Sequence, residues 1–162
     1  MKLITPLLAE AELEGRSTLK VLQRVPADKL DWRPHEKSMS LGQLASHLAN
    51  IPRTVMRLLD ANEFDLANAR PAPQSSGSAA ADFEQNLANM RAYMEKLDDA
   101  ALLQKFTLRK GDQVLQQFPK IGVLRNIFLN HSIHHRGQLS VYLRLLDVPV
   151  PAVYGTSADE AL

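Results

Sequence analysis

The sequence predicts an all-α fold, a bundle of four helices. Four stretches of the chain repeat apolar side chains at intervals of three and four residues, the period of a helix with one buried face. Between them lie segments with proline, glycine or serine, which interrupt helices. The chain has 162 residues, an ordinary size for one domain, so we expect a single domain over 1–162. One longer connection is expected around 62–78, as in bundles with a crossover.

The first helix is expected to run from Pro6 to Arg24. Thr5 is the expected N-cap, and Pro6 suits the first helical position because its missing amide proton has no helical partner there. Val25 and Pro26 should end the helix, since a residue that precedes proline avoids the helical conformation.

The second helix is expected from Leu41 to Ala61 and has the clearest start. Ser40 and Gln43 have the spacing of a capping box, in which each side chain bonds the backbone amide of the other residue. Pro52 interrupts the pattern and is a place where the helix can bend.

The third helix is expected from 79 to 97. Residues 70–78 read RPAPQSSGS, a composition typical of a loop, and Ser78 is the expected N-cap of the helix that follows. Beyond this helix the period of three and four stops, between Leu103 and Phe118. Short apolar runs there flank Lys110-Gly111-Asp112, which predicts either a short two-stranded hairpin or an irregular loop.

The fourth helix is expected from Pro119 to Asp147, and Pro149 should stop it. Its inward positions are Ile121, Leu124, Phe128, His131, His135, Leu139, Tyr142 and Leu146. The tail 149–162 contains apolar side chains that need cover, so we expect it to pack on the bundle near the fourth helix. These side chains are Val150, Val153 and Tyr154.

Composition excludes several classes of function. Nineteen Lys and Arg against eighteen Asp and Glu give a net charge of +1, too weak a field to favour a nucleic acid or an anionic membrane as partner. There is no cysteine, which excludes a disulfide framework, a cysteine zinc finger and a cysteine nucleophile, and which fits the cytoplasm, where we expect the protein. No glycine-rich phosphate loop or serine nucleophile motif is present.

The most informative feature is a pair of histidines at inward positions of the fourth helix. His131 and His135 are four residues apart, so they lie on one face and can share one divalent metal. His47 lies at the margin of the apolar face of the second helix and can complete a set of three. Three protein ligands leave a position open for water or substrate, as in catalytic metal sites. The alternative for each histidine is an ordinary hydrogen-bonded or surface residue.

Neighbouring polar residues have less specific patterns. His134 points about 100° away from His135, toward another helix or the surface. His35 is expected in a solvated loop. Asn130, Gln138 or a backbone carbonyl can accept the second N–H of a ligating histidine. Arg136 can hold an anionic substrate group, but an ordinary salt bridge is the favoured interpretation.

Three blocks of the chain resemble the DinB-like (damage-inducible) family. They are residues 32–47, WRPHEKSMSLGQLASH, residues 131–139, HSIHHRGQL, and residues 149–160, PVPAVYGTSADE. The resemblance covers nearly the whole chain, and the HxxxHHRGQ block is fairly specific when a matching upstream histidine is present.

The resemblance implies a four-helix bundle shared with thiol-dependent transferases and isomerases, whose members bind a divalent metal, often zinc or nickel, through three histidines. The family's ligands fall on His47, His131 and His135. The transferases bind a low-molecular-weight thiol at the open metal position, so the first hypothesis is a metal-dependent thiol S-transferase that acts on a small-molecule substrate. No catalytic side chain is identified beyond the metal ligands.

Two other functions stay open at this point. A metal-dependent hydrolase that uses bound water needs a general base, for which Glu36 or Asp159 would have to fold over the site. A non-catalytic metal-binding or stress-response protein needs no substrate site. A homodimer is expected in addition, because small bundles often pair through helix faces and the relatives are similar in this respect.

Overall fold

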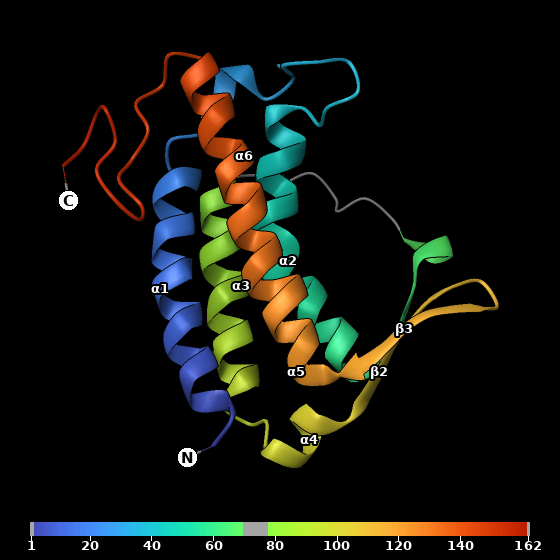
Figure 1. Cartoon of the computed structure of the whole chain (residues 1–162). Coiled ribbons are helices and arrows are strands. Elements are labelled where there is room, and N and C mark those ends of the chain that lie inside the picture. The colour runs from blue at the N-terminus through green and yellow to red at the C-terminus, as the bar shows by residue number, and fades with distance from the viewer. Residues whose placement is uncertain (1, 70–77, 162) are drawn as a thin grey trace.

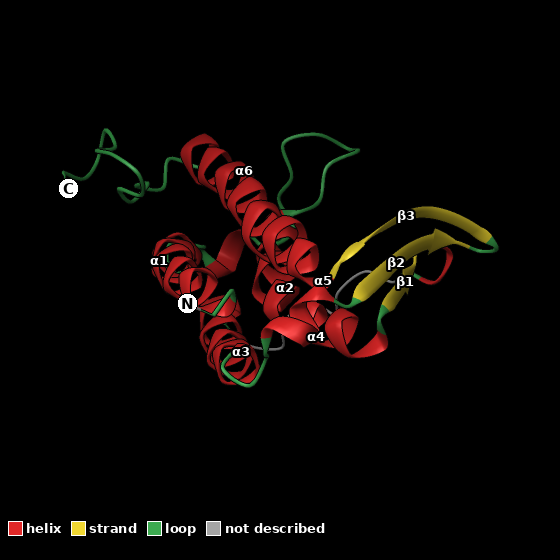
Figure 2. Cartoon of the chain, turned by 60° about the horizontal axis from the view of Figure 1, so that its bottom comes forward, coloured by secondary structure: helices red, strands yellow, loops and turns green. Residues whose placement is uncertain are grey.

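Four helical segments lie side by side and enclose the apolar core, in a computed structural model that describes residues 2–69 and 78–161 (Figure 1). Three of them are α1 (Ile4–Leu22), α2 (Leu41–Ala61) and α3 (Ala79–Met94). The fourth is built from α5 (Lys120–Gly122), η3 (Val123–Asn130) and α6 (His131–Leu145). The expectation of a helical bundle is confirmed, but all-α is wrong for one part of the chain, where a small mixed sheet stands beside the helices (Figure 2). Among the described residues no helix is both long and apolar enough to cross a membrane.

The start of α1 lies two residues before the predicted one. The helix begins at Ile4, and the predicted N-cap Thr5 is already inside it. The reason is a tertiary contact, because the amide of Leu3 donates to Oδ1 of Asp99 at 2.8 Å and satisfies a free amide at the helix start. Pro6 remains in the first turn, where its missing N–H costs nothing.

The bounds of α2 agree with the prediction. The amide of Ser40 donates to Oε1 of Gln43 at 2.8 Å, and the amide of Gln43 donates to Oγ of Ser40 at 3.2 Å, so the capping box is formed. The helix continues through Pro52 and ends at Ala61, and its C-cap residue Asn62 has a φ of 60° in the left-handed region.

The connection before α2 fixes the position of that helix start. It contains a short 3₁₀ turn, η1 (Ala27–Lys29). The amides of Leu41 and Gly42 donate to the carbonyls of Trp32 at 2.8 Å and Leu30 at 2.9 Å. A Cβ atom at Gly42 would lie 3.1 Å from the carbonyl oxygen of Leu30, so the absence of a side chain permits this close approach.

The sheet has three strands in the order β1-β2-β3: Glu63–Asp65, Lys105–Lys110 and Gln113–Pro119. β2 and β3 are antiparallel and form the hairpin that was one of two alternatives, with Gly111 at a φ of 57° in the turn. β1 pairs in parallel with β2 and was not predicted. A strand of three residues shows too little alternation to be recognised in the sequence.

α3 starts at the predicted residue but ends earlier than predicted. After β1 a 3₁₀ turn, η2 (Leu66–Asn68), follows within the expected connection, and the predicted loop 70–78 lies, except for Ser78, outside the described residues. Ser78 is the N-cap residue of α3, but its side chain makes no capping hydrogen bond. The helix ends at Met94 rather than Leu97, and the short helix α4 (Asp99–Leu103) follows.

The fourth helical segment is continuous from 120 to 145, but it is not α-helical throughout. η3 is a π-helix of eight residues. Val123 and Phe128 are both buried, and so are Leu124 and Leu129, and the members of each pair are five residues apart. Such a spacing puts both members on one face of a π-helix, with its i to i+5 bonds, but not of an α-helix.

The tail packs on the bundle as predicted. Ala152 is buried, and Val150 and Val153 pack against the core. Glu160 pairs at 2.5 Å with Arg24, which lies two residues beyond the end of α1 rather than inside the helix as predicted. The ring of Tyr154 is not covered as expected, since the residue is 67% exposed.

Candidate metal centre

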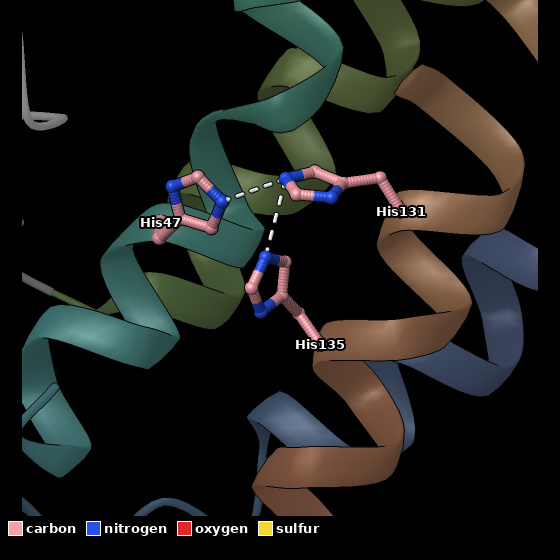
Figure 3. Close-up of side chains that lie close together, drawn as sticks. All are labelled: His47, His131 and His135. Carbon is pink, nitrogen blue, oxygen red and sulfur yellow. Dashed lines mark hydrogen bonds between the residues drawn. The ribbon is translucent and has the colours of Figure 1, made fainter. Parts of the chain in front are cut away.

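Two helices of the bundle bring the three predicted histidines together. His47 lies in α2, one turn after the capping box that fixes the start of this helix. His131 is the first residue of α6, directly after the π-helical segment, and His135 follows one turn later. Figure 3 shows the three imidazole rings pointing toward one another across the gap between α2 and α6.

The Nε2 atoms of the three rings converge on one point. Nε2 of His131 lies 3.0 Å from Nε2 of His47 and 3.1 Å from Nε2 of His135. One ligand atom from each residue lies within 4.8 Å of both others. Two nitrogens bound to one metal at about 2.1 Å are about 3.0 Å apart when they subtend a right angle. The spacing of His131 to each neighbour therefore fits a shared divalent ion.

The tautomers of the rings sharpen this result. A neutral imidazole has one N–H and one lone pair. Oε1 of Gln138 lies 2.7 Å from Nδ1 of His135 and accepts its proton, so His135 presents a lone pair at Nε2. A proton on His131 Nε2 can point along only one of that atom's two contacts. Whichever neutral tautomers His131 and His47 adopt, at least one of the two short N···N contacts cannot be a hydrogen bond, and a cation bound between the rings would remove the resulting repulsion.

The surroundings keep the imidazoles neutral. Burial lowers the pKa of His47, and burial together with the neighbouring His47 and His134 lowers the pKa of His131. Burial lowers the pKa of His135 to about 4, although its hydrogen bond to Gln138 acts in the opposite direction. At neutral pH the three rings therefore offer lone pairs rather than N–H groups to a metal ion.

Of the other two histidines, neither belongs to this cluster. His134 is exposed on the surface of α6, with its ring centroid 5.0 Å from that of His135. His35 is exposed in the loop before α2, where its Nδ1 accepts the amide of Lys37 at 3.1 Å. Both placements agree with the interpretation from the sequence.

Gln138, rather than Asn130 or a backbone carbonyl, accepts the second N–H of a histidine in the cluster. It lies three residues after His135, so the two side chains are neighbours on the surface of α6. Asn130 instead donates to Oδ1 of Asn126 at 3.5 Å. The sequence alone left the three acceptors open, although the spacing of three residues from His135 is compatible with this bond.

Arg136 makes the salt bridge that was its favoured interpretation. Its guanidinium is 3% exposed and pairs with Glu14 of α1 at 2.7 Å. It also donates to the carbonyl of Glu14 at 3.0 Å, to Oγ1 of Thr18 at 3.3 Å and to the hydroxyl of Tyr154. The roles of Glu14 and Tyr154 as its partners were not predicted, because they lie far from Arg136 in the sequence.

The two acids that a hydrolase would require lie elsewhere. Glu36 is exposed in the loop before α2. Asp159 pairs with Arg144 at 2.5 Å and accepts the amide of Val150 at 2.8 Å. Neither carboxylate bonds a histidine of the cluster in the described part of the chain.

A cavity of about 450 Å³ lies apart from the histidines, between α1 and α3. Its lining includes Leu8, Met90, Met94 and Phe128, and the ion pair between Glu12 and Arg91, at 2.5 Å, lies at its edge. None of the three histidines contributes to its lining, so the cavity does not extend the candidate metal centre.

Comparisons with known proteins agree with this architecture. The family model of the DinB family matches residues 2–161. Two uncharacterized proteins of Bacillus subtilis (strain 168) are similar to the chain. YrdA is 26% identical over 150 residues, which cover 92% of this chain and 86% of YrdA. YjoA is 26% identical over 133 residues, which cover 78% of this chain and 80% of YjoA.

Two crystal structures of DinB-like proteins share the fold. That of YjoA from Bacillus subtilis has a TM-score of 0.69 and 18% identity, and the match covers 90% of this chain and 96% of that one. The protein from Bacillus cereus ATCC 10987 has a TM-score of 0.69 and 22% identity, with 91% and 95% covered.

Proposed function

Because the chain belongs to the DinB family, we propose that His47, His131 and His135 bind one divalent metal ion, and that the protein is a metal-dependent enzyme that acts on small molecules. The observation that carries the proposal is the convergence of three Nε2 atoms, at least one of whose two short contacts cannot be a hydrogen bond. Zinc and nickel are the proposed ions because the family resemblance implies them, and three imidazoles are compatible with either.

The proposed activity is that of a thiol-dependent S-transferase. A bound metal would lower the pKa of a thiol at its open position and so supply the nucleophile at neutral pH. The chain has no cysteine, so the thiol would come from a low-molecular-weight cosubstrate. The protein's own residues would hold the ion and leave a position free, and His135 would be fixed in orientation by Gln138.

Metal binding is tested by calorimetry on protein purified without a His-tag and stripped of metal. Zn²⁺ and Ni²⁺ should each bind wild-type protein with a stoichiometry near one per chain. His131→Ala should abolish binding, because the ring of His131 contacts both others. His134→Ala is the matched control and should keep most of the affinity, since its exposed ring lies outside the cluster. A stoichiometry near zero for wild-type protein would refute the three-histidine site.

Catalysis is tested separately from metal binding. Turnover of a model electrophile is followed with a set of small thiols, with metal-free protein, metal-loaded protein and metal-supplemented His131→Ala. Thiol consumption that requires both the metal and His131 supports the transferase. Metal binding without turnover of any thiol would favour the non-catalytic metal-binding alternative.

We also propose that the protein is a homodimer. Support comes from α6, whose outer surface exposes Val141 and Leu145, each 57% exposed and one turn apart. Pairing through this helix would bury both side chains. Light scattering at high concentration should return about twice the chain mass of 18.1 kDa, and the dimer should weaken in Val141→Lys. A mass near that of one chain would refute it.

A further inference from the structure

The bond between His135 and Gln138 has a consequence for the charge of the site. Gln138 is the one side chain of the described residues whose oxygen bonds a ring nitrogen of the cluster. Its Oε1 can only accept, so it requires the proton of His135 on Nδ1 and leaves Nε2 as the ligand atom. An amide partner performs this orientation without adding a charge.

Carboxylates are absent from the immediate contacts of the cluster in the part of the chain that is described. The groups that bond or face the three rings are one another, Gln138 and His134. Glu14 lies on α1, but its carboxylate is taken by Arg136 at 2.7 Å and by the hydroxyl of Tyr154 at 2.6 Å. The donor set is therefore three neutral imidazoles backed by a neutral amide.

The neutral donor set decides what a bound ion would attract. A carboxylate behind a histidine makes that ligand more basic and lowers the effective charge of the metal. Three uncharged ligands backed by an amide leave a divalent ion with its full double charge. A ligand that carries a negative charge is then favoured at the open position over a neutral one, because it alone offsets this charge.

Building on the proposed metal site, we infer that Gln138 is a positioning residue, which orients His135 without placing a negatively charged side chain beside the metal. It follows that the open position of the metal selects an anionic group. On this inference, neutral electrophiles such as esters or amides are disfavoured as the group bound at the metal, since a neutral group leaves the double charge of the ion unbalanced. The favoured groups are thiolates and monovalent inorganic anions such as azide, each of which carries one formal negative charge and a lone pair.

The test uses two substitutions of Gln138 and one matched control. Gln138→Glu keeps the shape and the acceptor but adds a charge, and Gln138→Leu removes the acceptor. Gln116→Glu adds the same charge on the exposed strand β3, far from the histidines in the fold. Gln138 is itself exposed, so both substitutions should leave the fold intact, which circular dichroism checks.

Zn²⁺ affinity is measured by calorimetry, and azide binding is followed by the visible spectrum of Co²⁺-loaded protein. We expect Gln138→Glu to bind Zn²⁺ at least as tightly as wild-type protein and azide about tenfold more weakly. Gln138→Leu should lose about tenfold or more in Zn²⁺ affinity. Gln116→Glu should match wild-type protein in both.

Nitrogen NMR of the metal-free protein gives a readout that a structural role would not move. Wild-type protein should hold His135 in the Nδ1–H tautomer, and Gln138→Leu should show a mixture of both. Normal Zn²⁺ binding with unchanged azide affinity in Gln138→Glu, or an unchanged tautomer in Gln138→Leu, would overturn the inference. Failure of wild-type protein to bind any metal would instead overturn the proposed function on which the inference rests.

Discussion

The two helices that carry the histidines are held in place by different means. α2 starts at a reciprocal capping box, and its buried residues follow the α-helical period from Leu41 to Leu59. The histidines of the fourth helical segment follow eight residues of π-helix, and this segment is bound to α1 and to the tail through the buried Arg136. The position of α2 is therefore defined by its own sequence. The position of the fourth helical segment is defined by the residues that pack against it.

This difference predicts how each helix should respond when its register is changed. In α2 a shift of one residue turns everything beyond it by about 100° away from the core. In η3 the loss of one residue brings the buried pairs from five to four residues apart, which an α-helix accommodates on one face. The π-helical segment thus contains one residue more than an α-helix would need to place the same apolar side chains on one face.

Deletion of Asn50 from α2 and deletion of Asn126 from η3 form the strongest test of this difference. Loss of Asn50 should displace Val55, Leu58 and Leu59 from the core, at a cost of more than about 5 kcal/mol, and should abolish metal binding. Loss of Asn126 should leave a folded protein that binds Zn²⁺ within about threefold of wild type, because the register after it is kept. Urea unfolding and calorimetry measure both. Equal damage from the two deletions would contradict the comparison.

The dependence of α6 on its partners can be tested at Arg136. Arg136→Met leaves Glu14 without its buried ion pair and should lower the free energy of unfolding by about 3 kcal/mol. Arg125→Met removes the pair with Glu10, at 2.6 Å, whose side chains are more exposed, and should cost less than about 1 kcal/mol. Urea unfolding compares them, and equal losses would show that the buried network does not hold α6.

The sequence was sufficient for α2 and for the identity of the clustered histidines, because both depend on local spacing. It was insufficient where distant contacts decide the local structure. The start of α1 depends on Asp99, a residue 96 positions away from Leu3. The strand β1 exists only because β2 lies beside it.

The π-helix left a trace in the sequence that was not used. The two pairs of buried apolar residues five apart stand out only when one knows which residues are buried. An α-helical period accounted for the other apolar residues of this segment, so nothing in that pattern indicated a π-helix. The partners of Arg136 could not be predicted for the same reason, since Glu14 and Thr18 belong to another helix.

The contact between α2 and α6 at the histidines should respond to pH. The pKa of His135 is about 4 in the folded protein and near 6.5 in an unfolded chain. The unfolded state therefore binds more protons between these values, so metal-free protein should be most stable above pH 6.5 and lose stability down to pH 4. His47 and His131, which face His135, are partly exposed, so solvent screens the cluster. The loss in free energy of unfolding should therefore be only on the order of 1–2 kcal/mol.

Urea unfolding of metal-free protein across this range is the measurement. The variant His135→Gln should lose most of the dependence between pH 6.5 and 4. Asp65 and Asp159 have pKa values lowered by their hydrogen bonds, so their effect belongs to lower pH and stays separate. A slope unchanged in His135→Gln would show that another group is responsible.

The smallest expected effect concerns the local signal that starts α2. Ser40→Ala removes the capping bond to the amide of Gln43 and should cost about 1 kcal/mol. Ser78→Ala is the matched control at the N-cap of α3, where the hydroxyl makes no capping bond, and should cost only a few tenths of that. Thermal unfolding resolves the two, and an equal shift in Tm would mean that the capping box contributes nothing beyond helix propensity.

His47 and His131 are 84 residues apart in the chain, and this separation decides when a metal can arrive. A zinc finger gathers its ligands from one short segment, so its ion can be captured first and organise the fold. Closing so long a loop for two imidazoles alone is entropically unfavourable, so the packed helices must bring the rings together before any ion can join them. During synthesis the His47 segment leaves the ribosome long before its partners exist. Loading with metal is then a step that follows folding, and the ion that occupies the site is set by what the finished protein meets in its compartment.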